Sequence, residues 1–317
     1  MTPRMTWILI GAVLASAVAG CSGERDPGDL LGPGEAGTIV VEARLIVGET
    51  FPTVLLHKTL SPDRPYHRDE AALPGARVWI IGPAADTVFY YEDTGSPRAD
   101  RYVPGPDSSG IPVVNARTHY RLEVRAADGR IVSAETTTPD PFAVREWLLL
   151  NSDETVRRSL ATATPGDSEF FDQNLLTYQD GLVEARFDRG SAVAFEVALH
   201  SLSDGSPLLI DADFLSPADL ASLERDSSSP AFDAPDGALR LPWGAVWYEG
   251  IYRIDIYSVD RNWYDLVRTT RFEDFNFGFG SNAGDDFERP IFHINGGIGL
   301  FGSAAVSSNY FDFLPKP

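Results

Sequence analysis

The side chains able to do defined chemistry are few, and the first of them is a single cysteine. Cys21 is the only cysteine among 317 residues, so its thiol cannot form an internal disulfide and is available for another covalent role. No G-x-S-x-G marks a serine nucleophile. The five histidines show neither an H-E-x-x-H pattern nor a close pair, which leaves a zinc hydrolase unsupported; they are His57, His67, His119, His200 and His293.

Other cofactor chemistry is disfavoured by composition. Both methionines stand in the first five residues, and the only lysines are Lys58 and Lys316. Copper, haem-thiolate and Schiff-base sites therefore lack suitable side chains. We expect no cofactor and no enzyme of a recognised type.

Cys21 directly follows a segment with the order of a secretory signal. A basic start with Arg4 precedes an uncharged apolar run over residues 7–20, which is shorter than the roughly 20 residues of a spanning helix. The tetrad Val18-Ala19-Gly20-Cys21 resembles the lipobox of bacterial lipoproteins. That resemblance implies that residues 1–20 are removed and that Cys21 becomes a diacylglyceryl cysteine carrying further acyl chains such as palmitate. An ordinary signal peptide with a chance cysteine, or an N-terminal membrane anchor, is the alternative.

The stretch after Cys21 predicts a flexible tether to about residue 37, because it is rich in Gly, Pro and acids and poor in apolar residues. Ser22 in the position after the cysteine resembles the pattern that permits sorting to the outer membrane. The formal net charge of the whole chain is −20, which makes nucleic acid and anionic headgroups poor partners for the protein as a whole. We expect an exported protein held on the outer membrane by its lipid, with the face of the membrane left open.

Short alternating segments over residues 38–140 predict an N-terminal β-sandwich domain of immunoglobulin-like or transthyretin-like type. Strands are expected near residues 39–45, 53–57, 76–81, 87–91, 120–126 and 130–137. Asp128-Gly129 separates the last two and is typical of a tight hairpin. The prolines of Thr138-Pro139-Asp140-Pro141 mark the domain boundary.

Residues 141–317 predict a larger C-terminal β-rich domain with two short helices. Strands are expected near residues 146–150, 181–187, 192–202, 207–210, 247–258 and 292–294. One helix is expected to start at Ser216-Pro217, where a hydroxyl N-cap precedes proline, and the other to cover roughly residues 262–271. The fold class is therefore mainly β.

The order of these features resembles the lipoprotein family of domain of unknown function 4249. The matching segments are Ile39-Val40-Val41-Glu42, Thr53-Val54-Leu55-Leu56, Pro74-Gly75-Ala76-Arg77-Val78, Ser258-Val259-Asp260-Arg261-Asn262-Trp263-Tyr264 and Asn295-Gly296-Gly297-Ile298-Gly299-Leu300-Phe301-Gly302. The resemblance implies an outer-membrane lipoprotein often encoded beside a TonB-dependent transporter. It supplies no catalytic residues.

Two segments are candidates for a partner or ligand surface. Residues 297–302 formally fit the dinucleotide pattern G-x-G-x-x-G, but the chain ends before a βαβ unit is completed. They therefore predict a glycine-bent terminal strand, with a docking edge for a partner as the alternative. The second segment, residues 275–286, combines aromatics, glycines and acids, and Asp285 with Asp286 lacks the EF-hand spacing for calcium. The candidate residues are Phe277, Phe279, Asn295, Gly297, Gly299 and Phe301.

The sequence thus predicts a non-catalytic accessory binding or scaffolding lipoprotein, anchored through Cys21 and a candidate partner of a TonB-dependent transporter. Two other classes stay open. A small-ligand or glycan carrier requires the C-terminal domain to close into a barrel around an apolar cavity. An enzyme of unrecognised type requires titratable groups that converge in one cleft.

Overall fold

The computed structural model describes residues 36–61, 65–83, 86–106, 110–163, 173–209, 216, 224–241, 243–267 and 291–316. The signal segment, the lipobox with Cys21 and most of the predicted tether lie outside these ranges. So do the helix expected after Ser216 and the candidate residues Phe277 and Phe279.

The first lobe is built mainly from the first seven strands. Apolar residues alternate with polar ones along these strands, so one face of each is buried. The strands are β1 (Ile39–Ile46), β2 (Val54–Lys58), β3 (Arg77–Ile81), β4 (Thr87–Glu92), β5 (Arg101–Pro104), β6 (His119–Arg125) and β7 (Ile131–Thr137), with the four-residue helix α3 (Arg68–Ala71) between β2 and β3. Gly129 adopts φ +90° in the turn between β6 and β7, as the Asp-Gly pair predicts.

The second lobe follows from residue 144 onward. Its strands are β8 (Val144–Leu150), β9 (Val156–Leu160), β10 (Leu175–Thr177), β11 (Leu182–Phe187), β12 (Ala194–Ser201), β13 (Asp226–Ser228), β14 (Ala238–Arg240) and β15 (Gly250–Val259). A short 3-10 helix, η3 (Trp243–Ala245), precedes β15, and α6 (Arg261–Val267) follows it. The chain ends with β16 (Ile294–Asn295) and the 17-residue strand β17 (Ile298–Leu314).

The strands form two sheets. The larger has thirteen strands and runs in the order β13-β12-β15-β17-β1-β2-β5-β4-β3-β6-β7-β16, with β10 paired to β17, and the smaller has the order β14-β11-β8-β9. In the second lobe the smaller sheet packs on β12, β15 and β17, and aromatic side chains such as Trp147, Phe195 and Phe311 fill the space between them. This sandwich-like arrangement confirms the predicted mainly β fold class.

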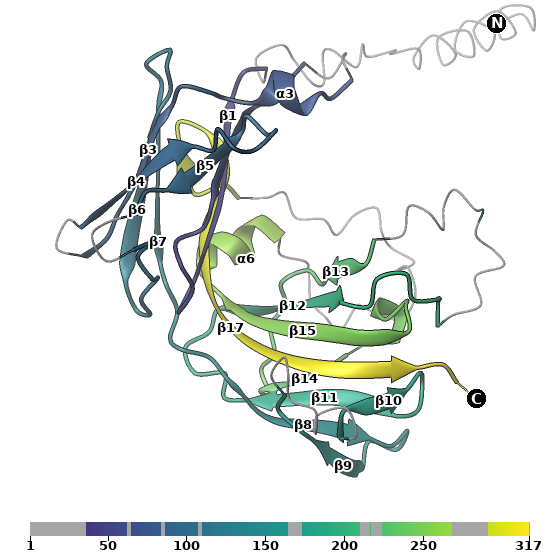
Figure 1. Cartoon of the computed structure of the whole chain (residues 1–317). Helices are drawn as coiled ribbons and strands as arrows, with labels where there is room; N and C mark the ends of the chain where they lie inside the picture. Colours follow the sequence, from purple (N-terminus) through teal and green to yellow (C-terminus); the bar gives the residue numbers. More distant parts are fainter. Residues whose placement is uncertain are drawn as a thin grey trace, which may run out of the picture.

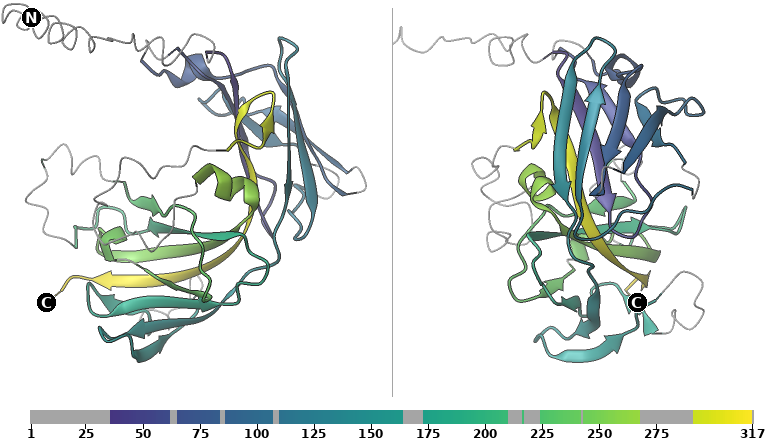
Figure 2. Two further views of the ribbon diagram at one scale, coloured as in Figure 1. Left: turned by 180° about the vertical axis from the view of Figure 1, so that it is seen from behind. Right: turned by 90° about the vertical axis from the view of Figure 1, so that its left-hand side faces the viewer.

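Strand β17 belongs to both lobes. Its first part pairs in parallel with β1, from Val40↔Ile298 to Ile46↔Ala304. Its second part pairs antiparallel with β15, from Val259↔Ala304 to Gly250↔Phe313. Figure 1 shows this strand in yellow, curving out of the first lobe and along the second, and Figure 2 shows the same course from behind. The predicted domain boundary at residue 140 stays a prediction, but β17 joins residues from both sides of it.

Three apolar clusters follow this division. One fills the first lobe, one fills the second, and a small one around Trp263 of α6 packs where the lobes meet. In the part of the chain that the structure describes, no helix is long and apolar enough to cross a membrane.

Most expected strands are present within one or two residues of their expected bounds. The expected strands do not include β5, β9, β10, β13 and β14. Two further differences are local. Residues 207–209 form only an isolated bridge between Leu208 and Tyr248. The helix α3 is not expected from the sequence, because its single turn, Arg68–Ala71, is too short to show helical periodicity.

Candidate binding site at the junction of the lobes

The junction of the two lobes contains an open cavity of about 370 Å³. This volume is within the usual range for small-ligand sites, about 300–1,000 Å³. Its walls come from the end of β7, the segment before β12 and the start of α6, and they are His119, Glu135, Thr136, Thr137, Pro139, Ser191, Ala192, Val193, Val259, Asp260, Arg261 and Asn262. The cavity therefore lies where strands from both lobes converge.

Asp260 lines this cavity and directly precedes α6. It is 7% exposed, and its Oδ1 accepts a hydrogen bond from the Trp263 N–H at 2.9 Å, which makes it an N-cap residue. Thr136 donates to the other carboxylate oxygen and lies 2.9 Å from the Ser303 hydroxyl. Burial raises the pKa of the Asp260 carboxyl, although the hydrogen bonds from Thr136 and from the Trp263 N–H oppose that shift. One residue from each of β7, β17 and the start of α6 is thus joined in a single buried polar cluster.

The adjacent edge of β17 is occupied by residues of the same chain. Asn262 donates through Nδ2 to the Phe301 carbonyl at 2.9 Å and to the Glu135 carbonyl at 2.6 Å. The Asp260 N–H donates to the Ser303 carbonyl at 2.9 Å. A docking segment would need unpaired groups on a strand edge. On this side of β17 the carbonyls of Phe301 and Ser303 already accept hydrogen bonds from Asn262 and Asp260.

The glycines of the terminal motif allow β17 to approach β1. A Cβ atom at Gly297 would lie 2.6 Å from the Ile39 carbonyl oxygen, and one at Gly299 would lie 2.1 Å from the Val41 carbonyl oxygen. Gly299 also has φ +114°, which side chains rarely adopt. Phe301 is 1% exposed and packs in the core of the first lobe. These positions therefore have a demonstrable packing role, and their proposed role in docking stays a prediction.

Asn295 is the remaining candidate residue within the described part of the chain. It is exposed and pairs with Ser133 of β7 through β16. It does not line the junction cavity. The candidate residues of the terminal motif are therefore the exposed Asn295, the half-buried Gly297 and Gly299 and the buried Phe301.

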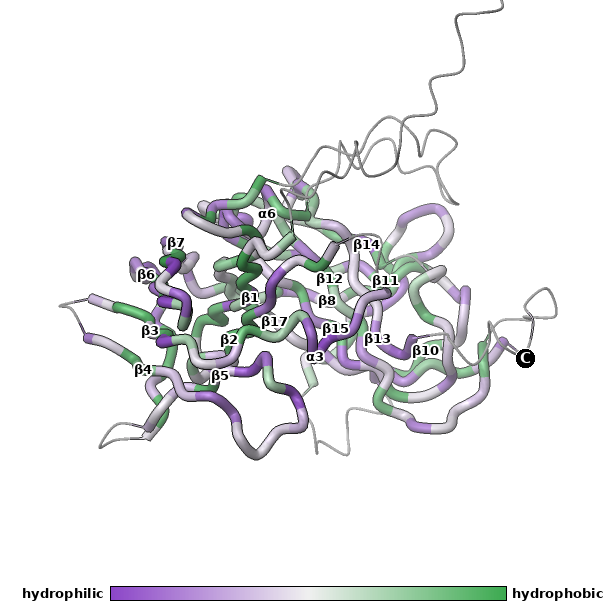
Figure 3. The backbone as a smooth tube through the Cα atoms, turned by 90° about the horizontal axis from the view of Figure 1, so that it is seen from above, coloured by the Kyte–Doolittle hydropathy of each residue, from purple (hydrophilic) through white to green (hydrophobic). Residues whose placement is uncertain are grey.

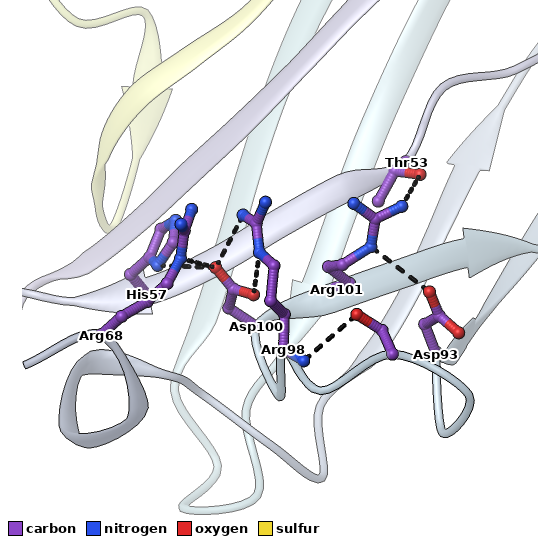
Figure 4. Close-up of polar contacts among 8 residues, drawn as sticks. Thr53, His57, Arg68, Asp93, Arg98, Asp100 and Arg101 are labelled. Carbon is purple, nitrogen blue, oxygen red and sulfur yellow. Dashed lines mark hydrogen bonds and ion pairs between the residues drawn. The ribbon is translucent and has the colours of Figure 1, made fainter. Parts of the chain in front are cut away.

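A second polar cluster lies at the other end of the first lobe (Figure 4). The Asp100 carboxylate is 1% exposed and receives hydrogen bonds from Arg68 Nε at 3.0 Å and from Arg98 Nε and Nη2 at 3.3 Å, while His57 Nδ1 lies 3.5 Å away. Burial alone would raise the pKa of Asp100, but the two arginines outweigh burial and lower it. The cluster connects α3, β2 and the loop before β5, and each arginine already satisfies a carboxylate, so its evident role is to fix that end of the lobe.

A third cluster lies on the face of β12 and β15 that points away from the core of the second lobe. His200 lies between two carboxylates, with Nδ1 3.2 Å from Asp226 and Nε2 3.3 Å from Asp255. Arg253 donates to Asp255 at 3.0 Å. Burial raises the pKa of Tyr257, and the nearby charge of Asp255, which accepts a hydrogen bond from the Tyr257 hydroxyl at 3.2 Å, raises it further.

None of these clusters forms a metal centre within the described ranges, where no three His, Cys, Asp or Glu side chains are arranged to hold an ion. The imidazole of His200 separates its two acids instead of converging with them. The other histidines occupy different surroundings: His293 Nε2 lies 2.8 Å from Asp265, and His119 lines the junction cavity.

Sequence reasoning did not identify the junction residues as a site. Asp260 and Asn262 stand in one of the family-like segments, but their partners Thr136, Phe301 and Ser303 are distant in sequence. The only local signal is the N-cap pattern at Asp260, which precedes a helix. The alternation of Arg253, Asp255 and Tyr257 in the sequence indicates a polar strand face. It does not indicate which residues of other strands lie beside that face.

Comparison with known proteins gives one informative match. No curated protein matches the chain significantly. The solved structure of murine CEACAM1b is similar at 14% sequence identity, covering 87% of this chain and 100% of that chain, but its TM-score of 0.17 supports no conclusion. The model of the family described as "Domain of unknown function (DUF4249)" matches residues 29–309. Because this match spans most of the sequence, the chain belongs to the DUF4249 family.

Proposed function

We propose that this protein is an outer-membrane lipoprotein that acts as a non-catalytic accessory binding or scaffolding component, and that its partner is a TonB-dependent transporter. The lipobox-like tetrad before Cys21 supports the anchor. The transporter partner is what the family resemblance implies. The structure contributes one observation, which concerns the shape and stiffness of the body that the anchor would hold.

That observation is the shared strand β17. A hinge between lobes normally requires a few residues that are free to change their backbone angles. Here the connection is a continuous strand with ladder partners along its length in β1 and β15, and the cluster of Asp260, Thr136 and Ser303 joins the same region. A body that holds two lobes at a fixed angle is suited to present surfaces to a partner.

The proposal is tested by affinity purification from solubilised outer membranes. A tag placed after Pro317 lies beyond the end of β17, at the far end of the second lobe (Figure 1). We expect the tagged protein to recover a TonB-dependent transporter in a constant ratio. Recovery of the protein alone, under detergents that preserve other transporter complexes, contradicts the partnership.

The anchor is tested separately with Cys21→Ser. Without the thiol the diacylglyceryl chain cannot be attached, so we expect release from the membrane fraction or retention of the uncleaved signal. Metabolic labelling with palmitate should mark the parent chain and leave the variant unlabelled. Unchanged membrane retention of a fully processed Cys21→Ser chain contradicts the lipid anchor.

A second candidate function rests on the junction cavity. Its volume and its mixture of charged, amide and hydroxyl side chains suit a small polar ligand such as a saccharide unit. By contrast, the interior of the second lobe is filled with side chains. Native mass spectrometry of the protein purified without denaturant tests for such a ligand, and Glu135→Gln should weaken its retention if the cavity is the site.

A further inference from the structure

The outer face of β3, β4 and β6 carries aromatic side chains in contact with solvent. On these strands alternate residues such as Val78, Ile80 and Tyr90 point into the core of the first lobe. The residues between them point outward, and among these Phe89 is 57% exposed and Tyr91 is 63% exposed. The right-hand view of Figure 2 looks onto this side of the lobe, and Figure 3 shows hydrophobic stretches on β3 and β4 where they run to the margin of the molecule.

Two arginines lie beside these aromatics. Arg77 and Arg125 are both exposed and are direct cross-strand partners, a position in which like charges repel each other. Neither forms an ion pair within the described part of the chain, and Arg125 lies 5.4 Å over the ring of Trp79. Two neighbouring arginines without an ion pair among the described residues are notable in a chain with a net charge of −20. We call Arg77, Trp79, Phe89, Tyr91, Arg125 and Ile131 the arginine–aromatic face.

The Tyr91 ring packs on the backbone of the neighbouring segment. Gly105 lies under Tyr91, and a Cβ atom at Gly105 would lie 2.4 Å from the Tyr91 ring. The Gly105 N–H donates to the Phe89 carbonyl at 2.7 Å. This hydrogen bond holds Gly105 beside the strand that carries both aromatic residues. The rings therefore stand outward from a fixed backbone.

The chain leaves the body for its N-terminus at one end of this face. Arg130 stands between Arg125 and Ile131 in the turn after β6, and its guanidinium donates to the Gly37 carbonyl. Cys21 is 16 residues before Gly37, and such a length reaches at most about 55 Å even when fully extended. A lipid on Cys21 would thus keep this end of the first lobe within about 55 Å of the membrane.

We infer that the arginine–aromatic face lies against the anionic lipid surface to which Cys21 is anchored. Guanidinium groups pair with phosphate oxygens, and aromatic side chains settle at the level of the headgroups. The strongly acidic remainder of the molecule is repelled by the same surface, which favours the approach of a face whose arginines form no ion pair within the described part of the chain. The inference rests on the proposed anchor.

A weak contact is sufficient for this role. Once Cys21 is held in the bilayer, docking of the face is an intramolecular step with a high effective concentration. The contact then determines the orientation of the body instead of providing the attachment. It would leave the second lobe and the junction cavity directed away from the lipid.

The test uses the mature chain, residues 21–317, coupled through Cys21 to a maleimide-bearing lipid. Cys21 is the only cysteine, so this coupling supplies the anchor chemically and the result does not depend on lipidation in the cell. The rate of modification of each arginine by phenylglyoxal is read by mass spectrometry. We expect Arg77 and Arg125 to react roughly three-fold or more slowly on vesicles containing phosphatidylglycerol than on phosphatidylcholine alone.

Arg145 and Arg157 are internal controls, because they are exposed on the second lobe and should react equally on both vesicles. Equal rates for Arg77 and Arg125 on both vesicles overturn the inference, as does equal protection of all four arginines. Protection of Arg77 and Arg125 by a soluble acidic polysaccharide, without protection by the anionic vesicles, assigns the face to another ligand and also overturns it.

A variant pair gives an independent readout. The double substitution Arg77→Gln with Arg125→Gln should remove the preference for phosphatidylglycerol when uncoupled protein is floated with vesicles at low ionic strength, where a weak contact between exposed charges is strongest. Arg145→Gln with Arg157→Gln should leave that preference unchanged. A melting curve confirms that each variant is folded. Salt should weaken the binding of the parent chain, since the contact is between exposed charges.

Discussion

Asp100 and Asp260 are both buried carboxylates, yet their surroundings shift their pKa values in opposite directions. Asp100 is held by two arginines that outweigh the effect of burial, whereas Asp260 is held by uncharged donors that do not. A carboxylate with a lowered pKa stabilises the fold in its ionised form, and one with a raised pKa stabilises it in its protonated form. The two residues therefore predict opposite pH dependence.

Asp100→Asn should destabilise the protein at neutral pH. Breaking a buried ion pair costs about 3–5 kcal/mol, and because Arg68 and Arg98 are partly exposed and regain water, we expect about 2 kcal/mol. The contribution of Asp100 is present above its ordinary pKa of 3.8 and is lost as the pH falls through the lower folded-state value. Urea unfolding should therefore separate variant and parent at pH 7 and bring them together in acid.

Asp93→Asn is the matched control, because the Asp93–Arg101 pair is partly exposed on both sides. Its loss should cost less than about 1 kcal/mol. Equal effects of the two substitutions would show that the burial of Asp100 has no energetic consequence.

Asp260→Asn should change the pH dependence in the other direction. The asparagine Oδ1 can still accept the Trp263 N–H, so the cap is retained. The protonated Asp260 contributes stability below its ordinary pKa, and this is lost as the pH rises through the raised folded-state value. Melting temperatures of variant and parent should diverge in favour of the variant as the pH rises above 3.8, the ordinary pKa of the carboxyl. Asp204→Asn, in an exposed turn, is the control substitution.

At the scale of the element, β17 explains both what sequence patterns predict and what they miss. Alternation and turn residues depend on local backbone geometry, and they predict most strands, the helix after Asp260 and a glycine-bent terminal strand. These local patterns do not identify which strand pairs with β17, because the pairing Val41↔Gly299 depends on packing between distant parts of the chain. For the same physical reason, the proximity of Thr136, Asp260 and Ser303, and the cross-strand meeting of Arg77 with Arg125, could not be predicted.

Gly299→Ala should be strongly destabilising. The strained φ alone costs about 1–3 kcal/mol, and the new Cβ atom would lie 2.1 Å from the Val41 carbonyl oxygen, so the β1–β17 ladder must also shift. We expect a loss of about 3 kcal/mol or more in chemical unfolding. Gly48→Ala is the control for the backbone term, because Gly48 has φ +85° with nothing within 4 Å of a Cβ atom. Similar losses in the two variants would contradict the importance of the close approach.

At the scale of the whole molecule, the shared strand predicts that the lobes unfold together. Removal of residues 294–317 deletes β16 and β17, and we expect the first lobe to lose cooperative folding although residues 36–140 remain. Removal of residues 315–317 alone, which follow β17, should leave the unfolding midpoint unchanged. The fluorescence of Trp79, isolated by comparison with Trp79→Phe, reports on the unfolding of the first lobe. If this fluorescence still shows a cooperative unfolding transition after removal of residues 294–317, the first lobe does not depend on the shared strand.

The parallel ladder between β1 and β17 also determines when the protein can finish folding. Val41 and Gly299 are 258 positions apart in the sequence, and contacts between distant residues form slowly because a long loop must close first. A chain made from its N-terminus has the strands β1 to β7 available long before their last neighbour exists. The first lobe is therefore completed only when β17 has been made, and under the proposed export this would keep the lobe open until β17 has crossed the membrane.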